Sequence, residues 1–171
     1  MKFVKLYIRL INKLNKLVGL SVSVLMPVMV IILFLEVTAR YVFKSPTIWT
    51  YDLSIFMFGY VGLLSGAYVH QIKGHVNVDI IYSKLTLRQK SIIDSVTGLL
   101  FFFFIILVIL YSSENAIYAI ENSETTATEW GPPIGHFKLM IPIGASLLLL
   151  QELANWLGNI YRAITNKELK L

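Results

Sequence analysis

Long apolar stretches dominate the chain. Three of them contain no charged residue, at 17–35, 53–72 and 95–113, and a fourth, at 139–161, carries only Glu152. A helix needs about 20 mostly apolar residues to cross a bilayer, so each stretch predicts a membrane-spanning helix. With their flanking turns, the spans are expected over 17–43, 52–72, 93–113 and 137–161. The predicted fold class is all-α, an integral membrane four-helix bundle formed by a single domain over 1–171.

Two segments outside the spans have an amphipathic pattern. In residues 2–16 the basic side chains fall within an arc of roughly 80° at 100° per residue, with apolar side chains opposite. Residues 77–90 place Ile81, Tyr82 and Leu85 at helical spacing beside a basic edge. A helix with one basic and one apolar face lies in the plane of the membrane surface. We therefore expect interfacial helices over 2–16 and 77–90.

Composition agrees with a membrane protein. Of the 171 residues, 56% are hydrophobic and 15% are charged, whereas soluble domains average roughly 25% charged residues. The net charge of +5 reports orientation in such a protein, so no nucleic-acid partner is expected. The chain has no cysteine, which excludes disulfides, thiolate metal sites and a cysteine nucleophile.

The distribution of lysine and arginine predicts the orientation of the chain. Twelve of the 15 lie before the first span, between the second and third, or after the fourth: Lys2, Lys5, Arg9, Lys13, Lys16, Lys73, Lys84, Arg88, Lys90, Arg162, Lys167 and Lys170. The other two loops hold only Arg40, Lys44 and Lys138. Basic residues accumulate on the cytoplasmic side, so both termini and the middle loop are expected in the cytoplasm. The acidic loop between the third and fourth spans would then face outward.

The stretch GHVNVDIIYSKL, at 74–85, lies in the middle loop. Gly74 is expected to end the second span, as glycine often does at a helix C-terminus. His75 would then lie near the negative end of that helix dipole, and Asp79 would fall in the first turn of the next helix. One histidine and one carboxylate make a weak metal pattern, because zinc takes three or four protein ligands. We therefore expect a structural turn and no metal site.

Three segments carry a resemblance to a known family. They are EVTARYVF at 36–43, PTIWTYDLS at 46–54 and GAYVHQIKGHVNVDIIYSKL at 66–85. In this order and spacing they resemble the small membrane subunit of TRAP transporters, the tripartite ATP-independent periplasmic transporters, and the likeness covers roughly residues 15–160. Two positions depart from the family pattern. Asp52 stands where a glutamate is usual, and Thr86 stands where a proline is frequent.

The resemblance implies a transport role without catalysis. In this family a large membrane subunit carries the substrate and sodium sites, and a periplasmic binding protein delivers an organic acid. The small subunit braces the large one, so the expected partners are the large TRAP subunit, the binding protein and the lipid bilayer. Because the sequence stops at Leu171, soon after the fourth span, we expect the large subunit to be a separate chain. The expected location is the bacterial inner membrane, and the expected substrate is a C4-dicarboxylate or, on overall likeness, sialic acid.

Several polar residues near the spans are candidates for structural or subunit contacts. Glu36 and Arg40 are four residues apart and share a helix face, and Asp52 begins the second span at the same membrane level. We expect an ion-pair cluster of these three, since charges near hydrocarbon are costly unless paired. The cluster would also hold the loop 43–49 in place. Trp49 fits the outer interfacial zone as an anchor or a subunit contact.

Two further features inside the spans are candidates. Gly62 and Gly66 form a GxxxG pattern that allows close helix contact, either within the bundle or with the large subunit. Glu152 is a carboxylate within an apolar span and therefore a functional candidate by default. The simpler expectation is that it lies in the cytoplasmic quarter of the fourth span and reaches headgroups, His70 or a partner.

Other classes of four-span protein remain as alternatives. A membrane-anchor subunit of a redox complex would need facing axial ligands for haem. The only histidines are His70, His75 and His136, and the first and last are expected at opposite membrane faces, so no haem or other cofactor is expected. A self-sufficient small carrier would need a charged site in mid-span, and Glu36 is too near the span's end. An intramembrane enzyme would need a nucleophile–base or metal cluster, which the sequence does not suggest.

Overall fold

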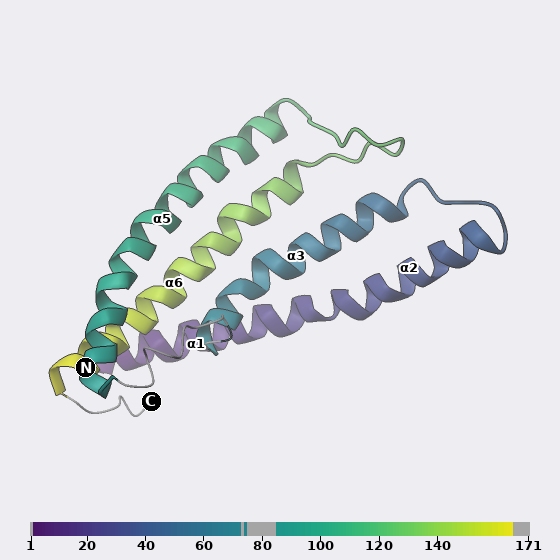
Figure 1. Cartoon of the computed structure of the whole chain (residues 1–171). Coiled ribbons are helices and arrows are strands. Elements are labelled where there is room, and N and C mark those ends of the chain that lie inside the picture. The colour runs from purple at the N-terminus through teal and green to yellow at the C-terminus, as the bar shows by residue number, and fades with distance from the viewer. Residues whose placement is uncertain (1, 73, 75–84, 166–171) are drawn as a thin grey trace.

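The computed structural model describes residues 2–72, 74 and 85–165, and these residues are almost entirely helical (Figure 1). The helices are α1 (Lys2–Ser23), α2 (Leu25–Tyr41), α3 (Thr50–Gln71), α5 (Leu87–Glu121) and α6 (Gly135–Thr165). Four helical units are long and apolar enough to cross a membrane, because α1 and α2 together form one unit of 40 residues. The predicted all-α fold with four spans is confirmed.

The first span and the amphipathic segment before it form one nearly continuous helix. The interruption lies at Val24, which keeps helical dihedral angles of φ −63° and ψ −24°. Pro27 explains its position, because proline has no N–H to donate to the carbonyl of Ser23 four residues earlier. The helix has no break at residue 16, where the first span was predicted to begin. The amphipathic segment continues through α1 into α2 without a sharp turn.

The helices form an open row and not a bundle closed around a central core. Neighbours pack in the order α5, α6, α3, α2, and α1 contacts both α3 and α6 (Figure 1). The two inner helices of the row are buried more than the outer ones. In their most apolar segments, 33% of α6 and 17% of α3 is buried, against 11% of α5 and 6% of the α1–α2 unit. The row therefore leaves broad apolar faces open on its outer helices.

Small residues bring the helices of the row close together. A Cβ at Gly144 of α6 would lie 2.5 Å from the backbone oxygen of Leu63 in α3. In α5, which packs against α6, Ala116 and Ala119 are 0% and 1% exposed. Glycine and alanine allow two helix backbones to approach closely, which is how membrane helices pack when water supplies no driving force between them.

Helix α5 begins with a capping box at Thr86. The Thr86 side chain accepts from the Gln89 N–H, and the Gln89 side chain accepts from the Thr86 N–H at 2.9 Å. Thr86 itself is extended, with ψ 161°, so the interfacial helix predicted over 77–90 cannot continue through it. Residues 87–90 belong to the spanning helix, and 77–84 lie outside the described residues. The span predicted to end at 113 continues to Glu121.

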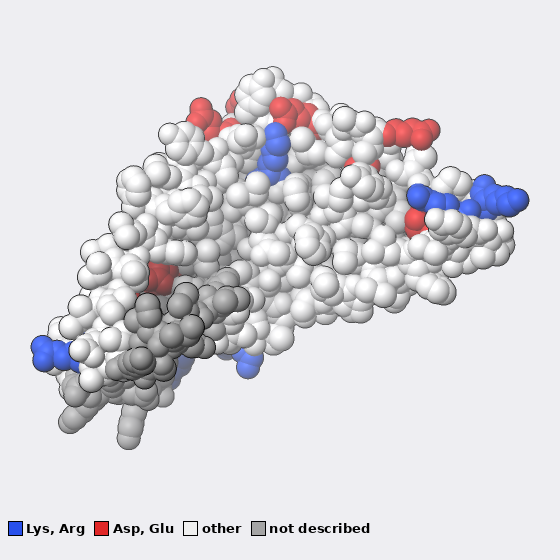
Figure 2. Space-filling model, in the orientation of Figure 1, with Lys and Arg blue, Asp and Glu red and all other residues white. Residues whose placement is uncertain are grey.

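The α2–α3 and α5–α6 connections lie at the same end of the molecule, opposite the N-terminus (Figure 1). Carboxylates gather around the α5–α6 connection, where Glu114, Glu121 and Glu129 are exposed (Figure 2). Arg40, near the end of α2, and Lys44, in the α2–α3 connection, are both exposed, and Figure 2 shows Lys and Arg side chains at this tip of the molecule. This end therefore presents an acidic zone and a separate basic zone side by side.

Candidate functional site

The carboxylate of Glu36 joins α2 to the connection that follows it. Arg40 donates to Glu36 Oε1 at 2.7 Å, which confirms the expected pair on one helix face. Thr47 donates to Glu36 Oε2 through its backbone N–H at 3.1 Å and its hydroxyl at 2.6 Å. The Thr47 hydroxyl also lies 2.5 Å from that of Thr50, the first residue of α3. The expected attachment of the loop 43–49 is therefore present.

Asp52 does not join the Glu36–Arg40 pair. It is 2% exposed and accepts a hydrogen bond of 2.5 Å from the hydroxyl of Thr128, in the α5–α6 connection. The hydroxyl of Thr126 lies 2.7 Å from that of Thr128 and extends the contact. The predicted three-residue cluster of Glu36, Arg40 and Asp52 is therefore wrong. Asp52 instead fastens the start of α3 to the acidic connection across the row.

The glycines of α3 fall into two classes. A Cβ at Gly59 would lie 2.3 Å from the Phe137 ring, so this glycine packs inside the row. A Cβ at Gly62 or Gly66 would have no atom within 4 Å, so both face open space. The GxxxG pattern therefore makes no contact within the described part of the chain. Trp49, just before α3, is 39% exposed.

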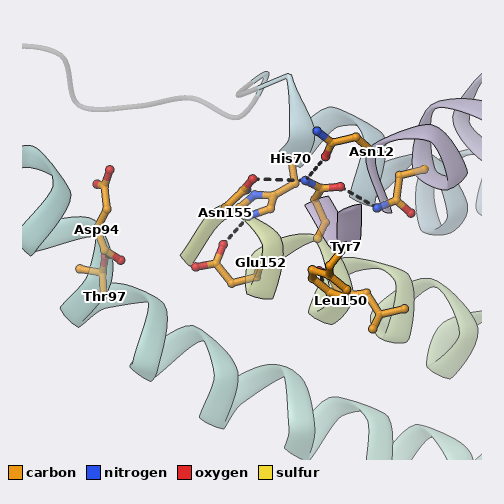
Figure 3. Close-up of polar contacts among 10 residues, drawn as sticks. Tyr7, Asn12, His70, Asp94, Thr97, Leu150, Glu152 and Asn155 are labelled. Carbon is orange, nitrogen blue, oxygen red and sulfur yellow. Dashed lines mark hydrogen bonds and ion pairs between the residues drawn. The ribbon is translucent and has the colours of Figure 1, made fainter. Parts of the chain in front are cut away.

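Glu152 forms a polar contact near the other end of the row. Glu152 is 7% exposed, and its carboxylate lies 2.6 Å from His70 Nε2 (Figure 3). The His70 ring stacks on Phe101 with ring centroids 5.6 Å apart. Gly98 of α5 lies opposite this contact, where an added Cβ would be 2.8 Å from Glu152 Oε1 and 2.9 Å from the Trp156 ring. The contact with His70, one of the expected options, thus connects α3, α5 and α6.

A second polar contact joins α1 to α6. Asn15 donates to Gln151 Oε1 at 2.7 Å, and Gln151 donates to Asn12 Oδ1 at 3.0 Å and to Asn155 Oδ1 at 3.2 Å. Tyr7 of α1 also donates to a backbone oxygen of α6 at 3.0 Å (Figure 3). Asn15 and Gln151 are each 1% exposed. We call Asn12, Asn15, Gln151 and Asn155 the amide clamp.

The amide clamp fixes the path of α1. Tyr7 and Asn15 are separated by about 12 Å along the helix, yet they bond to the adjacent residues Leu150 and Gln151. Helix α1 therefore crosses α6 and does not run along it. The clamp was not predicted from the sequence, although Asn12 and Asn15 are three residues apart in α1, and Gln151 and Asn155 are four residues apart in α6. Polar residues in such positions are a recognised signal of helix contact.

The remaining candidates concern the middle loop. Helix α3 ends at Gln71, and the Gly74 N–H bonds to the Val69 carbonyl at 2.9 Å, so Gly74 follows the helix end as expected. His75 and Asp79 lie outside the described residues. Among the residues that are described, no group of three His, Asp or Glu side chains could hold a metal ion.

The two described histidines are far apart. His136 packs against Phe56 with ring centroids 5.0 Å apart, whereas His70 contacts Glu152. Positions 136 and 152 of α6 are separated by roughly 24 Å along the helix. These two side chains therefore cannot hold one cofactor between them, and the geometry of the described polar residues is that of contacts between helices.

The family of the chain follows from residues 29–162. A family model described as "Tripartite ATP-independent periplasmic transporters, DctQ component" matches these residues, from the middle of the first span to the end of the fourth. The chain belongs to the DctQ family. It is a small membrane component of a TRAP transporter, a multi-pass protein of the bacterial inner membrane. No curated protein matches the sequence.

The residues matched by the DctQ family model include most of the polar contacts described above. The Glu36, Asp52 and Glu152 contacts all lie within residues 29–162. Helix α1, with Asn12 and Asn15 of the amide clamp, precedes the matched residues. Membership in a tripartite transporter family implies a large membrane subunit and a binding protein as partners.

Proposed function

We propose that this DctQ-family chain is a non-catalytic scaffold that packs against the separate large membrane subunit of a sodium-coupled transporter. The observation that carries the proposal is the open face of α3 around Gly62 and Gly66, where an added Cβ would meet no atom within 4 Å. Gly59, on the same helix, is already packed against Phe137. The row thus uses one glycine internally and leaves two available to another helix.

The open row supports the same partner. Large apolar side chains on this side of α3, Tyr51, Ile55 and Phe58, are 66%, 43% and 64% exposed. In a bilayer, lipid can cover such side chains without cost, so exposure alone does not identify a partner. Glycines are different, because a helix backbone can approach them more closely than an acyl chain requires. A transmembrane helix of the large subunit is therefore the occupant we assign to the Gly62–Gly66 face.

The polar contacts support a scaffold rather than an ion pathway. Each carboxylate in question has a partner within the chain. Glu36 bonds to Arg40 and Thr47, Asp52 bonds to Thr128, and Glu152 contacts His70. They connect neighbouring helices and connections of the row. Polar contacts at both ends of the row, those of Glu36 and Asp52 at one end and that of Glu152 at the other, hold its helices together. Such a row fits a static scaffold against which the large subunit moves. Substrate and sodium sites then belong to the large subunit.

Orientation and docking complete the proposal. Both termini and the middle loop are placed in the cytoplasm, because the basic residues concentrate there. The acidic zone around the α5–α6 connection and the Arg40–Lys44 tip then face the periplasm and meet the binding protein (Figure 2). The delivered substrate is an organic acid, either a C4-dicarboxylate or sialic acid.

The experiment compares Gly62→Leu with Thr97→Leu. Thr97 is an exposed residue of α5, and within the described part of the chain its hydroxyl bonds only to the carbonyls of Ile93 and Asp94 in its own helix. Both variants add bulk to an exposed helix face, so both chains should keep their own thermal stability. Only Gly62→Leu should reduce recovery of the large subunit on a tagged chain, by roughly tenfold for a lost close contact of about 1.4 kcal/mol. Wild-type recovery with Gly62→Leu would refute the assigned face.

A further inference from the structure

Helix α1 carries two exposed rows that the polar contacts of the chain do not use. The basic row consists of Lys2, Arg9, Lys13 and Lys16, all exposed. The apolar row consists of Phe3, Leu6, Leu10, Leu14 and Leu17, which are 87%, 52%, 56%, 41% and 64% exposed. At 100° per residue the centres of the two rows are about 90° apart around the helix.

The third side of α1 faces the row of helices. Ile8, Asn15 and Gly19 are buried, and a Cβ at Gly19 would lie 2.7 Å from Tyr68 in α3. The amide clamp holds the same side on α6. The orientation of α1 about its own axis is therefore fixed, and the apolar row points away from the neighbouring helices with the basic row beside it.

The basic row has no acidic counterpart within the described residues. None of the described salt bridges involves Lys2, Arg9, Lys13 or Lys16, and the first acidic residue of the sequence is Glu36. Like charges three and four residues apart, as at Arg9, Lys13 and Lys16, destabilise a helix. A surface built in this way gains most from an anionic ligand that contacts several of the cations together.

We infer that α1 binds anionic phospholipids, with the basic row on the headgroup phosphates and the apolar row in the adjoining acyl chains. The pairing of the two rows favours a lipid over an acidic protein or a nucleic acid, which would leave the apolar row in water. A helix with a basic face and an apolar face buries the latter at the headgroup boundary. Helix α1 leads directly into the first span, so the two rows adjoin the membrane at their Lys16 and Leu17 end.

Lipid binding at α1 is linked to the fold through the amide clamp. A ligand that binds only the folded state stabilises it in proportion to the logarithm of its concentration. All four cations lie on α1, and the amide clamp keeps their row turned away from α6, where lipid phosphates can reach it. Anionic lipid should therefore stabilise the packing of α1 as well as occupy its surface. This inference does not depend on which subunit covers Gly62 and Gly66.

The experiment uses the full chain in a neutral detergent and two lipids, phosphatidylglycerol and phosphatidylcholine. Phosphatidylglycerol at tenfold above its dissociation constant should raise the thermal midpoint by about 3–6 °C, and phosphatidylcholine and free inorganic phosphate should not. Each surface lysine or arginine contributes about fivefold to binding. The variant K2Q/R9Q/K13Q/K16Q should therefore bind phosphatidylglycerol at least tenfold more weakly.

A charge-conserving variant is the matched control. K2R/R9K/K13R/K16R keeps every positive charge and should keep the phosphatidylglycerol response. Should the glutamine variant fail to fold, wild-type protein in 1 M salt, where the Debye length is about 3 Å, should lose the response by itself. Equal stabilisation by both lipids, or a phosphatidylglycerol response that survives the glutamine substitutions, would overturn the inference. The inference would also be overturned if the glutamine variant lost the large subunit but kept the lipid response, because the basic row would then bind a protein and not lipid.

Discussion

Substitution of Gln151 by leucine tests the amide clamp most directly. Gln151 is 1% exposed and makes three hydrogen bonds, to Asn15, Asn12 and Asn155. Two of these bonds, to Asn15 and Asn12, join α1 to α6. Hydrogen bonds between membrane helices are worth about 0.6 kcal/mol each, so the loss of these two costs about 1 kcal/mol. The loss also leaves the Asn15 amide without a hydrogen-bond partner among the described residues, because its Oδ1 atom has none there either. An amide left unpaired in a buried site adds about 1 kcal/mol, for a total near 2 kcal/mol.

The unfolding of the purified full chain by an anionic detergent measures this loss. Ser146→Ala is the control, because among the described residues the Ser146 hydroxyl bonds only to the carbonyl of Pro142 in the same helix. It should change the free energy of unfolding by less than about 0.5 kcal/mol. The chain contains no cysteine, so single cysteines introduced on α1 and α6 for spin labelling also report whether α1 leaves α6. A Gln151→Leu chain as stable as Ser146→Ala, with α1 in place, would refute the clamp.

Three further predictions concern the row and its ends. Gly144→Ala should destabilise the chain by about 1–2 kcal/mol, because the added Cβ would lie 2.5 Å from a backbone oxygen of α3. This overpacking outweighs the better helix propensity of alanine. Gly66→Ala is the control and should leave thermal unfolding unchanged, because its added Cβ would meet no atom within 4 Å. Glu152→Gln should retain transport in a reconstituted complex, because an amide can still bond to His70, and an intact complex without transport would contradict this. Arg40→Ala should lower recovery of the complex by a fewfold while leaving the sodium-to-substrate ratio of the remaining complex unchanged; normal co-purification would contradict it.

The spans were predictable from the sequence because the signal is local. A run of 20 apolar residues has few alternatives to a membrane helix, whatever its neighbours are. The open row was not predictable, because the pairing of helices depends on small residues that occur on several faces. Gly59, Gly62 and Gly66 look alike in sequence, yet only Gly59 meets a side chain of α6. The boundary at Val24 depends on Pro27, whose effect appears one turn before it.

The polar contacts follow the same division between local and distant partners. Glu36 and Arg40 are one helical turn apart, and the sequence paired them correctly. Asp52 finds Thr128 at a separation of 76 residues, and Asn15 finds Gln151 at a separation of 136. No periodicity within one helix identifies such partners. The sequence shows only that a buried polar group in a span needs one.

The measurement that tests the scaffold role most directly is the composition of the complex extracted from the native membrane. A tagged chain would be taken into lipid nanodiscs without harsh detergent, and its companions identified and weighed by mass spectrometry. The account predicts one much larger polytopic membrane protein in a fixed ratio to this chain, with that protein lost from Gly62→Leu and kept by Thr97→Leu. Recovery of the chain alone, or only as a pair of identical copies, would contradict it.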